Sequence, residues 1–220
     1  MARRRARHDG AEPAPLGAAV ANDLAQALPV GRYTRTAIVL HWVIAVLVLT
    51  NIALAWTFKT WSDYPWTQSV TNLHKTVGIT ALGLALMRLL WRIAHRPPPF
   101  CPAIPHWQVR AARTGHAALY CVIIAMPLSG WIYDSAWEWA ADVPIDVFGL
   151  FEMPRIPWVM DMPQGPAKEA LDIAAGKIHV GLSYLLYFLL AAHLAGAFKH
   201  QWFDRVPTLE RMTFRGAARE

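Results

Sequence analysis

Five histidines of this chain lie in or beside long apolar stretches of the sequence: His41, His74, His116, His179 and His193. A side chain that can ionise or bind a metal is costly inside a membrane, so such a residue marks a functional site more often than a surface histidine does. For any one of them alone, a hydrogen bond between helices is the ordinary explanation. Their spacing therefore decides whether they form a site.

Four apolar stretches contain or border these histidines and predict membrane-spanning helices. Residues 36–58, 114–133 and 178–198 carry no charged side chain, and residues 72–93 carry charges only near their ends. At about 1.5 Å per residue, each stretch can cross a hydrocarbon core of about 30 Å. The composition agrees, since 55% of the 220 residues are hydrophobic and only 16% are charged. We therefore expect an all-α membrane protein with a four-helix bundle.

The Lys and Arg residues divide unevenly between the two sides of such a bundle. Most of the 21 fall in residues 1–35, 88–113 and 199–220, which all lie on one side of a four-span chain. The other side carries five: Lys59, Lys75, Arg155, Lys168 and Lys177. By the positive-inside rule, both termini are expected in the cytoplasm. The net charge of +6 thus predicts a topology rather than a nucleic-acid partner.

This topology predicts that four of the histidines lie at two depths. His179 and His193 fall on one face of the fourth span, about 21 Å apart along its axis. His41 is expected at the depth of His193, and His74 at the depth of His179. Two imidazoles can occupy both axial positions of a haem iron, which favours electron transfer over oxygen binding. The sequence therefore predicts two haem b groups, an inner one at His41 and His193 and an outer one at His74 and His179.

Another histidine and other ligands are the alternatives to this pairing. His116 shares the inner depth and competes for the inner haem, but it ranks third because it has no partner at the outer depth; we expect it near the membrane interface or a haem propionate. Zinc or di-iron would need carboxylates or thiolates at one depth, and the four stretches contain no Asp or Glu. Arginines such as Arg88 and Arg92 suit haem propionates and surface anchoring equally well. A haem-free bundle with hydrogen-bonded histidines is the further alternative.

The remaining segments predict the domain organisation. Residues 1–31 are basic and rich in Ala and Pro, and we expect them to be disordered, without a cleaved signal peptide. Residues 32–212 should form the four-helix domain and residues 213–220 a cytoplasmic tail. Residues 134–176, rich in Pro and Trp, are expected to form a compact outer loop in the headgroup zone, with a short interfacial helix near residues 167–175.

Several motifs make the chain resemble the bacterial cytochrome b561 family, which is related to the cytochrome b subunits of nickel-iron hydrogenases and formate dehydrogenases. They occur in order over about residues 31–212: RYTRTAIVLHW, NLHKTVGI, RTGHAALY, PLSGWIYDSA, VFGLF, KIHVGLSYLLYFLLAAHLAGAFKHQWFDR and TLERM. The resemblance implies a di-haem b protein of the bacterial inner membrane, with His41, His74, His179 and His193 as axial ligands.

The resemblance also implies a direction of electron transfer. Some members of the family are superoxide oxidases, which pass electrons from superoxide through both haems to ubiquinone. Their quinone-end segment resembles Lys199 and His200 here, followed by Asp204 and Arg205. If the chain is an enzyme, the resemblance implies a superoxide:ubiquinone oxidoreductase. If it is not, the resemblance implies an electron carrier. The alternative is a membrane anchor and electron-accepting subunit for a periplasmic redox partner that docks on residues 134–176.

Overall fold

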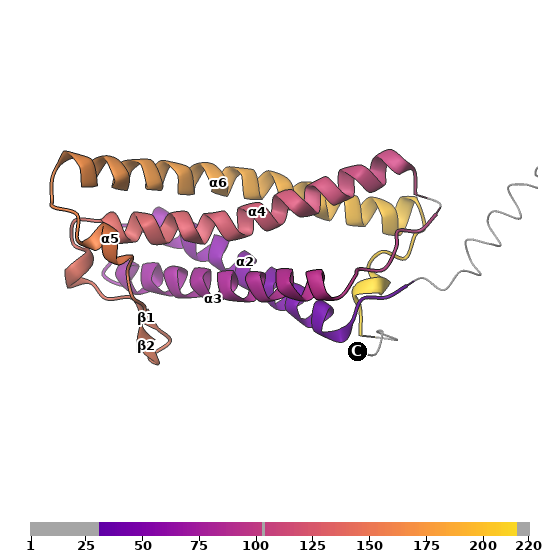
Figure 1. Cartoon of the computed structure of the whole chain (residues 1–220), viewed down its shortest axis with the longest axis horizontal. Coiled ribbons are helices and arrows are strands. Elements are labelled where there is room, and N and C mark those ends of the chain that lie inside the picture. Colours follow the sequence, from indigo (N-terminus) through magenta and orange to yellow (C-terminus); the bar gives the residue numbers. More distant parts are fainter. Residues whose placement is uncertain (1–30, 103, 215–220) are drawn as a thin grey trace, which may run out of the picture.

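Four long helices make up most of the computed structural model, which describes residues 31–102 and 104–214 (Figure 1). They are α2 (Arg35–Thr60), α3 (Thr67–Ala94), α4 (His106–Ala136) and α6 (Pro166–Phe198). All four are long and apolar enough to cross a membrane. The expectation of an all-α, four-span membrane bundle is confirmed.

Both ends of the described chain lie at the same end of the bundle (Figure 1). There the Tyr33 amide donates a hydrogen bond to the Arg211 carbonyl over 3.5 Å. We call this the terminal end. The opposite end is closed by residues 137–165, which we call the cap.

The helices pack as two hairpins, α2 against α3 and α4 against α6, and α3 joins the hairpins by its contact with α4. Within the described residues, α2 and α6 are not among the closely packed helix pairs. A buried cluster of Leu40, Ile44 and Ala85 fills the α2–α3 contact. Many other apolar side chains point outward, such as Leu90 and Phe188. This exposure suits helices whose surroundings are lipid rather than water.

Local sequence signals fix where two of the helices begin. The Thr34 hydroxyl accepts a hydrogen bond from the Ala37 amide over 3.3 Å, which caps the start of α2. Helix α6 begins with Pro166, whose ring lacks the amide hydrogen that a first helical residue does not need. Gly165 precedes it at φ 153°, a backbone angle that favours glycine.

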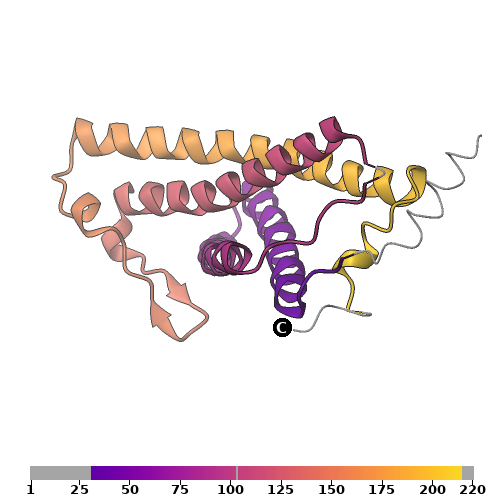
Figure 2. The same cartoon turned by 45° about the vertical axis from the view of Figure 1, so that its right-hand side comes forward.

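The cap is a short segment with four small elements. They are η1 (Ala140–Asp142), the two strands β1 (Asp146–Val147) and β2 (Phe151–Glu152), and helix α5 (Pro157–Met160). The strands form an antiparallel hairpin that projects sideways from the bundle (Figures 1 and 2).

Polar contacts hold the cap on the bundle. The Thr76 hydroxyl donates to the Asp146 carbonyl over 2.9 Å, and the Trp131 indole donates to the Pro154 carbonyl over 3.0 Å. The buried Asp134 carboxylate pairs with Lys75 of α3 at 2.5 Å and with Arg155 of the cap at 2.8 Å. One carboxylate therefore ties α3, α4 and the cap together.

The helices are longer than the expected spans. Helix α4 begins at His106 rather than at residue 114, and α6 begins at Pro166, so the connection does not extend to residue 176. The expectation of a separate interfacial helix near residues 167–175 is wrong, because these residues form the first turns of α6. Apolar runs mark the part of a helix that lipid surrounds, whereas backbone hydrogen bonds continue through flanking charged residues.

The expected domain boundaries stay predictions. Most of the N-terminal extension at residues 1–31, with His8, and most of the tail at residues 213–220 lie outside the described residues.

We expect Asp134→Asn to destabilise the protein by about 3–5 kcal/mol, because it leaves two largely buried cations without their carboxylate. The free energy of unfolding in mixed detergent micelles measures this. Asp142→Asn is the matched control, since Asp142 lies exposed in the same cap, and it should change stability by less than about 0.5 kcal/mol. Equal effects of the two substitutions would contradict the role given to Asp134.

Candidate functional site

Three histidines from three helices meet near the terminal end. The ring centres of His41 on α2 and His193 on α6 are 6.2 Å apart, and their planes are inclined by 67°. His116 on α4 also approaches His193, with ring centres 5.4 Å apart. The structure therefore brings the expected inner pair together and adds His116 to the same cluster.

Two histidines face each other nearer the cap end. His74 on α3 and His179 on α6 have ring centres 6.2 Å apart and planes inclined by 78°. The ring of Phe58 packs edge-on against His74 at 5.3 Å. This is the pair expected for the outer site, and each of its rings comes from a different hairpin.

Hydrogen bonds fix the orientation of the cap-end pair. His74 Nδ1 lies 3.1 Å from the Asn51 carbonyl oxygen, and His179 Nδ1 lies 3.0 Å from the Met126 carbonyl oxygen. A carbonyl only accepts, so in each neutral ring Nδ1 carries the hydrogen and Nε2 keeps its lone pair. Such a hydrogen bond orients a metal-binding histidine and makes its other ring nitrogen a stronger ligand for the metal.

The spacing of both 6.2 Å pairs fits one metal ion held between two imidazoles. A metal bound at about 2 Å to a nitrogen of each ring separates the ring centres by about 6 Å. The helices that carry the pairs, α2 with α6 and α3 with α6, are not among the closely packed helix pairs of the described residues, which suits a flat macrocycle between them. The residues present therefore fit the haem groups that the sequence predicts, His41 with His193 and His74 with His179.

Gly130 on α4 makes room for His179. A Cβ atom at this position would lie 3.0 Å from His179 Cε1 and 3.1 Å from Nδ1, so the ring would have to move by a few tenths of an ångström. The neighbouring Ser129 hydroxyl lies 3.2 Å from the same Nδ1. Residues 129 and 130 therefore shape the cap-end site.

The sequence did not predict these supporting residues. Ser129 and Gly130 belong to the motif PLSGWIYDSA, whose residue types point to no ligand. Asn51 has a polar amide side chain within the first apolar stretch, and a polar residue in a membrane span often belongs to a functional site. However, the group that contacts His74 is the backbone carbonyl of Asn51. Every residue type has such a carbonyl, so the sequence could not predict this contact.

The expected quinone-end residues form a cluster beyond α6. Residues Lys199–Phe203 form a π-helical turn, η2. The Asp204 carboxylate accepts from Lys199 Nζ at 2.6 Å and pairs with His200 Nδ1 at 2.7 Å. The hydrogen bond from Lys199 lowers the pKa of Asp204, with His200 contributing in the same direction. The carboxylate thus stays charged down to lower pH than an isolated aspartate.

A membrane helix bundle whose facing helices present paired, neutral imidazoles is the architecture of membrane cytochromes b. The chain belongs to the prokaryotic cytochrome b561 family, whose profile matches residues 32–215.

Curated relatives agree with this membership. The chain is 32% identical over 182 residues to cytochrome b561 homolog 2 of Escherichia coli, covering 82% of this chain and 90% of the relative. It is 28% identical to cytochrome b561 homolog 1 of the same organism, covering 82% and 96% of the two chains. It is also 28% identical to the probable superoxide oxidase CybB of Yersinia pestis, covering 82% and 95%.

Membership defines the general activity of this chain. It is a multi-pass protein of the bacterial inner membrane that binds haem b and transfers electrons across the membrane.

We expect Gly130→Ala to displace the His179 ring and lower the haem content per chain, because the new methyl group occupies the space of the imidazole. The haem-to-protein ratio and the reduced-minus-oxidised spectrum measure this. Gly181→Ala is the matched control on α6, since no atom lies within 4 Å of its Cβ position. Full haem content in Gly130→Ala would contradict the contact.

Proposed function

We propose that this chain carries electrons through two haem b groups, from a donor at the outer face of the inner membrane to ubiquinone near the inner face. The observation that carries the proposal is the pairing of imidazoles at two levels of α6, with ring centres 6.2 Å apart in each pair. These levels are separated by about 21 Å along the helix, so two sites would divide the membrane into shorter electron-transfer steps.

The charge distribution supports a cytoplasmic terminal end. The described part of this end is rich in cations: Arg32, Arg35, Arg88, Arg92, Arg96, Arg110, Arg113, Lys199, Arg205 and Arg211. The cap carries mostly acids. By the positive-inside rule the cap then faces the periplasm, and His74 with His179 forms the outer site.

Within this proposal, each histidine holds its ring neutral and directed at a shared position. When bound, haem b would supply one-electron transfer, and His41 with His193 and His74 with His179 would hold it. The carbonyls of Asn51 and Met126 hold the hydrogen on Nδ1 of the outer pair. Aromatic and aliphatic side chains, such as Phe58 beside His74, keep water from these rings.

The cluster at Lys199, His200 and Asp204 suits the ubiquinone end. Reduction of ubiquinone to ubiquinol takes up two electrons and two protons. His200 Nδ1 and the Asp204 carboxylate, 2.7 Å apart at the terminal end, can hold a proton within reach of the cytoplasm. Two superoxide ions would give the two electrons and leave as two molecules of oxygen, so the reaction balances.

Superoxide is the donor that we favour. The similarity to a relative named probable superoxide oxidase supports it. Lys75 follows His74 directly in the sequence. Lys75 and Arg155 both pair with the single carboxylate of Asp134, so two positive charges face one negative charge. This leaves a local positive charge beside the outer pair, which attracts a small anion despite the acidic cap.

A periplasmic redox partner is the second candidate donor, which would make this chain an anchor and electron-accepting subunit. Large apolar side chains of the cap support it, because they lie more than half exposed: Trp139, Phe148, Leu150, Phe151 and Trp158. Such a surface suits either the membrane interface or a docked protein.

Histidine substitutions test the pairing at the terminal end. We expect His193→Ala and His41→Ala each to remove one haem and leave the other, because only the inner site loses a ligand. His116→Ala is the matched substitution in the same cluster and should keep two haems. The haem-to-protein ratio, with the low-temperature reduced spectrum, measures this. Loss of a haem in His116→Ala with two retained in His41→Ala would reverse the assignment.

Stopped-flow kinetics test the donor. We expect superoxide pulses to reduce the haems of the purified protein much faster than those of His74→Ala, and added ubiquinone to reoxidise them. No difference between the two proteins would rule out superoxide oxidation. Copurification of a periplasmic redox protein, together with that result, would favour the anchor function.

A further inference from the structure

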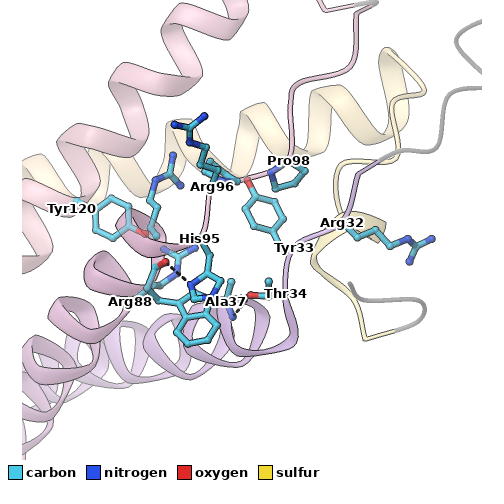
Figure 3. A pocket seen from close by; sticks show the side chains of 12 residues that line it. Arg32, Tyr33, Thr34, Ala37, Arg88, His95, Arg96, Pro98 and Tyr120 are labelled. Carbon is cyan, nitrogen blue, oxygen red and sulfur yellow. Dashed lines mark hydrogen bonds between the residues drawn. The ribbon is translucent and has the colours of Figure 1, made fainter. Parts of the chain in front are cut away.

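A basic pocket opens at the terminal end between α2, α3 and α4 (Figure 3). Its cavity volume is about 50 Å³, and the rest of the space between the lining side chains is open to solvent. Three arginines on or just after α3 line it, namely Arg88, Arg92 and Arg96. Arg88 and Arg92 are four residues apart, so they lie on one side of the helix, and Arg96 follows the end of α3. No acidic residue is among its lining side chains. The pocket therefore has an unbalanced positive charge.

The arginines are arranged around an aromatic ring rather than around a carboxylate. The guanidinium groups of Arg88 and Arg92 lie 5.4 Å and 5.8 Å from the ring centre of Tyr120. The buried Arg88 Nε has no hydrogen-bond partner. Arg32 extends away from the other side chains (Figure 3). An anion with several oxygens would supply the partner that the Arg88 nitrogen lacks.

The walls of the pocket are held in place without a ligand. The Trp91 indole donates to the Thr34 hydroxyl over 2.9 Å, which joins α3 to the start of α2. The His95 ring stacks on Trp91 with centres 3.9 Å apart. Arg211 donates to the carbonyls of Gly31 and Pro99 over 2.9 Å and 2.7 Å, tying the two flanking segments together. Such preorganisation reduces the entropy lost on binding.

We propose that this pocket binds the phosphate headgroup of an anionic phospholipid. Arg96 lies exposed just past the end of α3, whereas Arg88 lies one to two turns inside the helix, so the pocket spans the depth of the headgroups. Guanidinium groups bind phosphate oxygens in pairs, and basic pockets between membrane helices suit anionic lipids. Tyr33 and Trp91 supply the aromatic surface typical of this depth.

Haem carboxylates are the competing occupant. Arg88 interacts electrostatically with His41 and His193, so it faces the bundle interior as well as the pocket. Arg96 is exposed and lies beyond the end of α3, eight residues further along the chain than Arg88. A ligand that needs both Arg92 and Arg96 is better explained by a lipid at the membrane surface than by a macrocycle inside the bundle.

Native mass spectrometry of the haem-loaded full chain tests this proposal, with equal amounts of phosphatidylglycerol and phosphatidylcholine in the detergent. We expect the wild type to retain phosphatidylglycerol preferentially. Each arginine removed should weaken that preference about fivefold, so Arg92→Gln with Arg96→Gln should lower it on the order of 25-fold. Arg110→Gln is the matched control, because Arg110 is exposed at the same end but does not line the pocket.

Several outcomes would overturn the proposal: no lipid preference in the wild type, or an unchanged preference in the double variant. Unchanged lipid retention with altered haem content would assign the arginines to haem carboxylates. Binding of inorganic phosphate without a preference for phosphatidylglycerol would assign the pocket to a soluble anion. If the double variant does not fold, Arg96→Gln alone, beyond the end of α3, must show the fivefold loss.

Discussion

Paired imidazoles across two helix hairpins are the contact on which this bundle depends. A histidine inside a membrane is costly unless its polar atoms find partners, and here α6 offers His179 and His193 to rings on α3 and α2. The hairpins α2–α3 and α4–α6 otherwise meet mainly through α3 and α4. A ligand held between the rings would therefore join the hairpins as well as transfer electrons, so the function and the packing share the same residues.

The charged side chains at the two ends of the bundle have different partners. At the cap end, Asp134 takes up two cations and fixes the cap over His74 and His179. At the terminal end, the arginines around Tyr120 have no acidic neighbour in the pocket. The charged groups at the cap end thus stabilise the fold, whereas the arginines at the terminal end can bind an anion. The same asymmetry underlies the positive-inside rule, by which the basic end of such a bundle faces the cytoplasm.

The sequence predicted the helices and the histidine pairs because both follow from distance along the chain. Apolar length defines a span, and fourteen residues between His179 and His193 define two levels on one face. Depth along the bundle does not give the position of a residue around a helix axis. The sequence therefore ranked His116 below His41 but did not predict that both rings approach His193. The cap hairpin, the contact between Gly130 and His179, and the full lengths of α4 and α6 depend on tertiary contacts and backbone hydrogen bonds, which residue types specify only weakly.

The number of haem groups per chain tests the central claim most directly. A pyridine haemochrome assay on the purified full chain, referred to protein concentration by amino-acid analysis, gives this number without any assumption about donor or acceptor. Two histidine pairs predict two haem b per chain, with two midpoint potentials in a redox titration. A single haem per chain, or a fully folded protein without haem, would contradict the account.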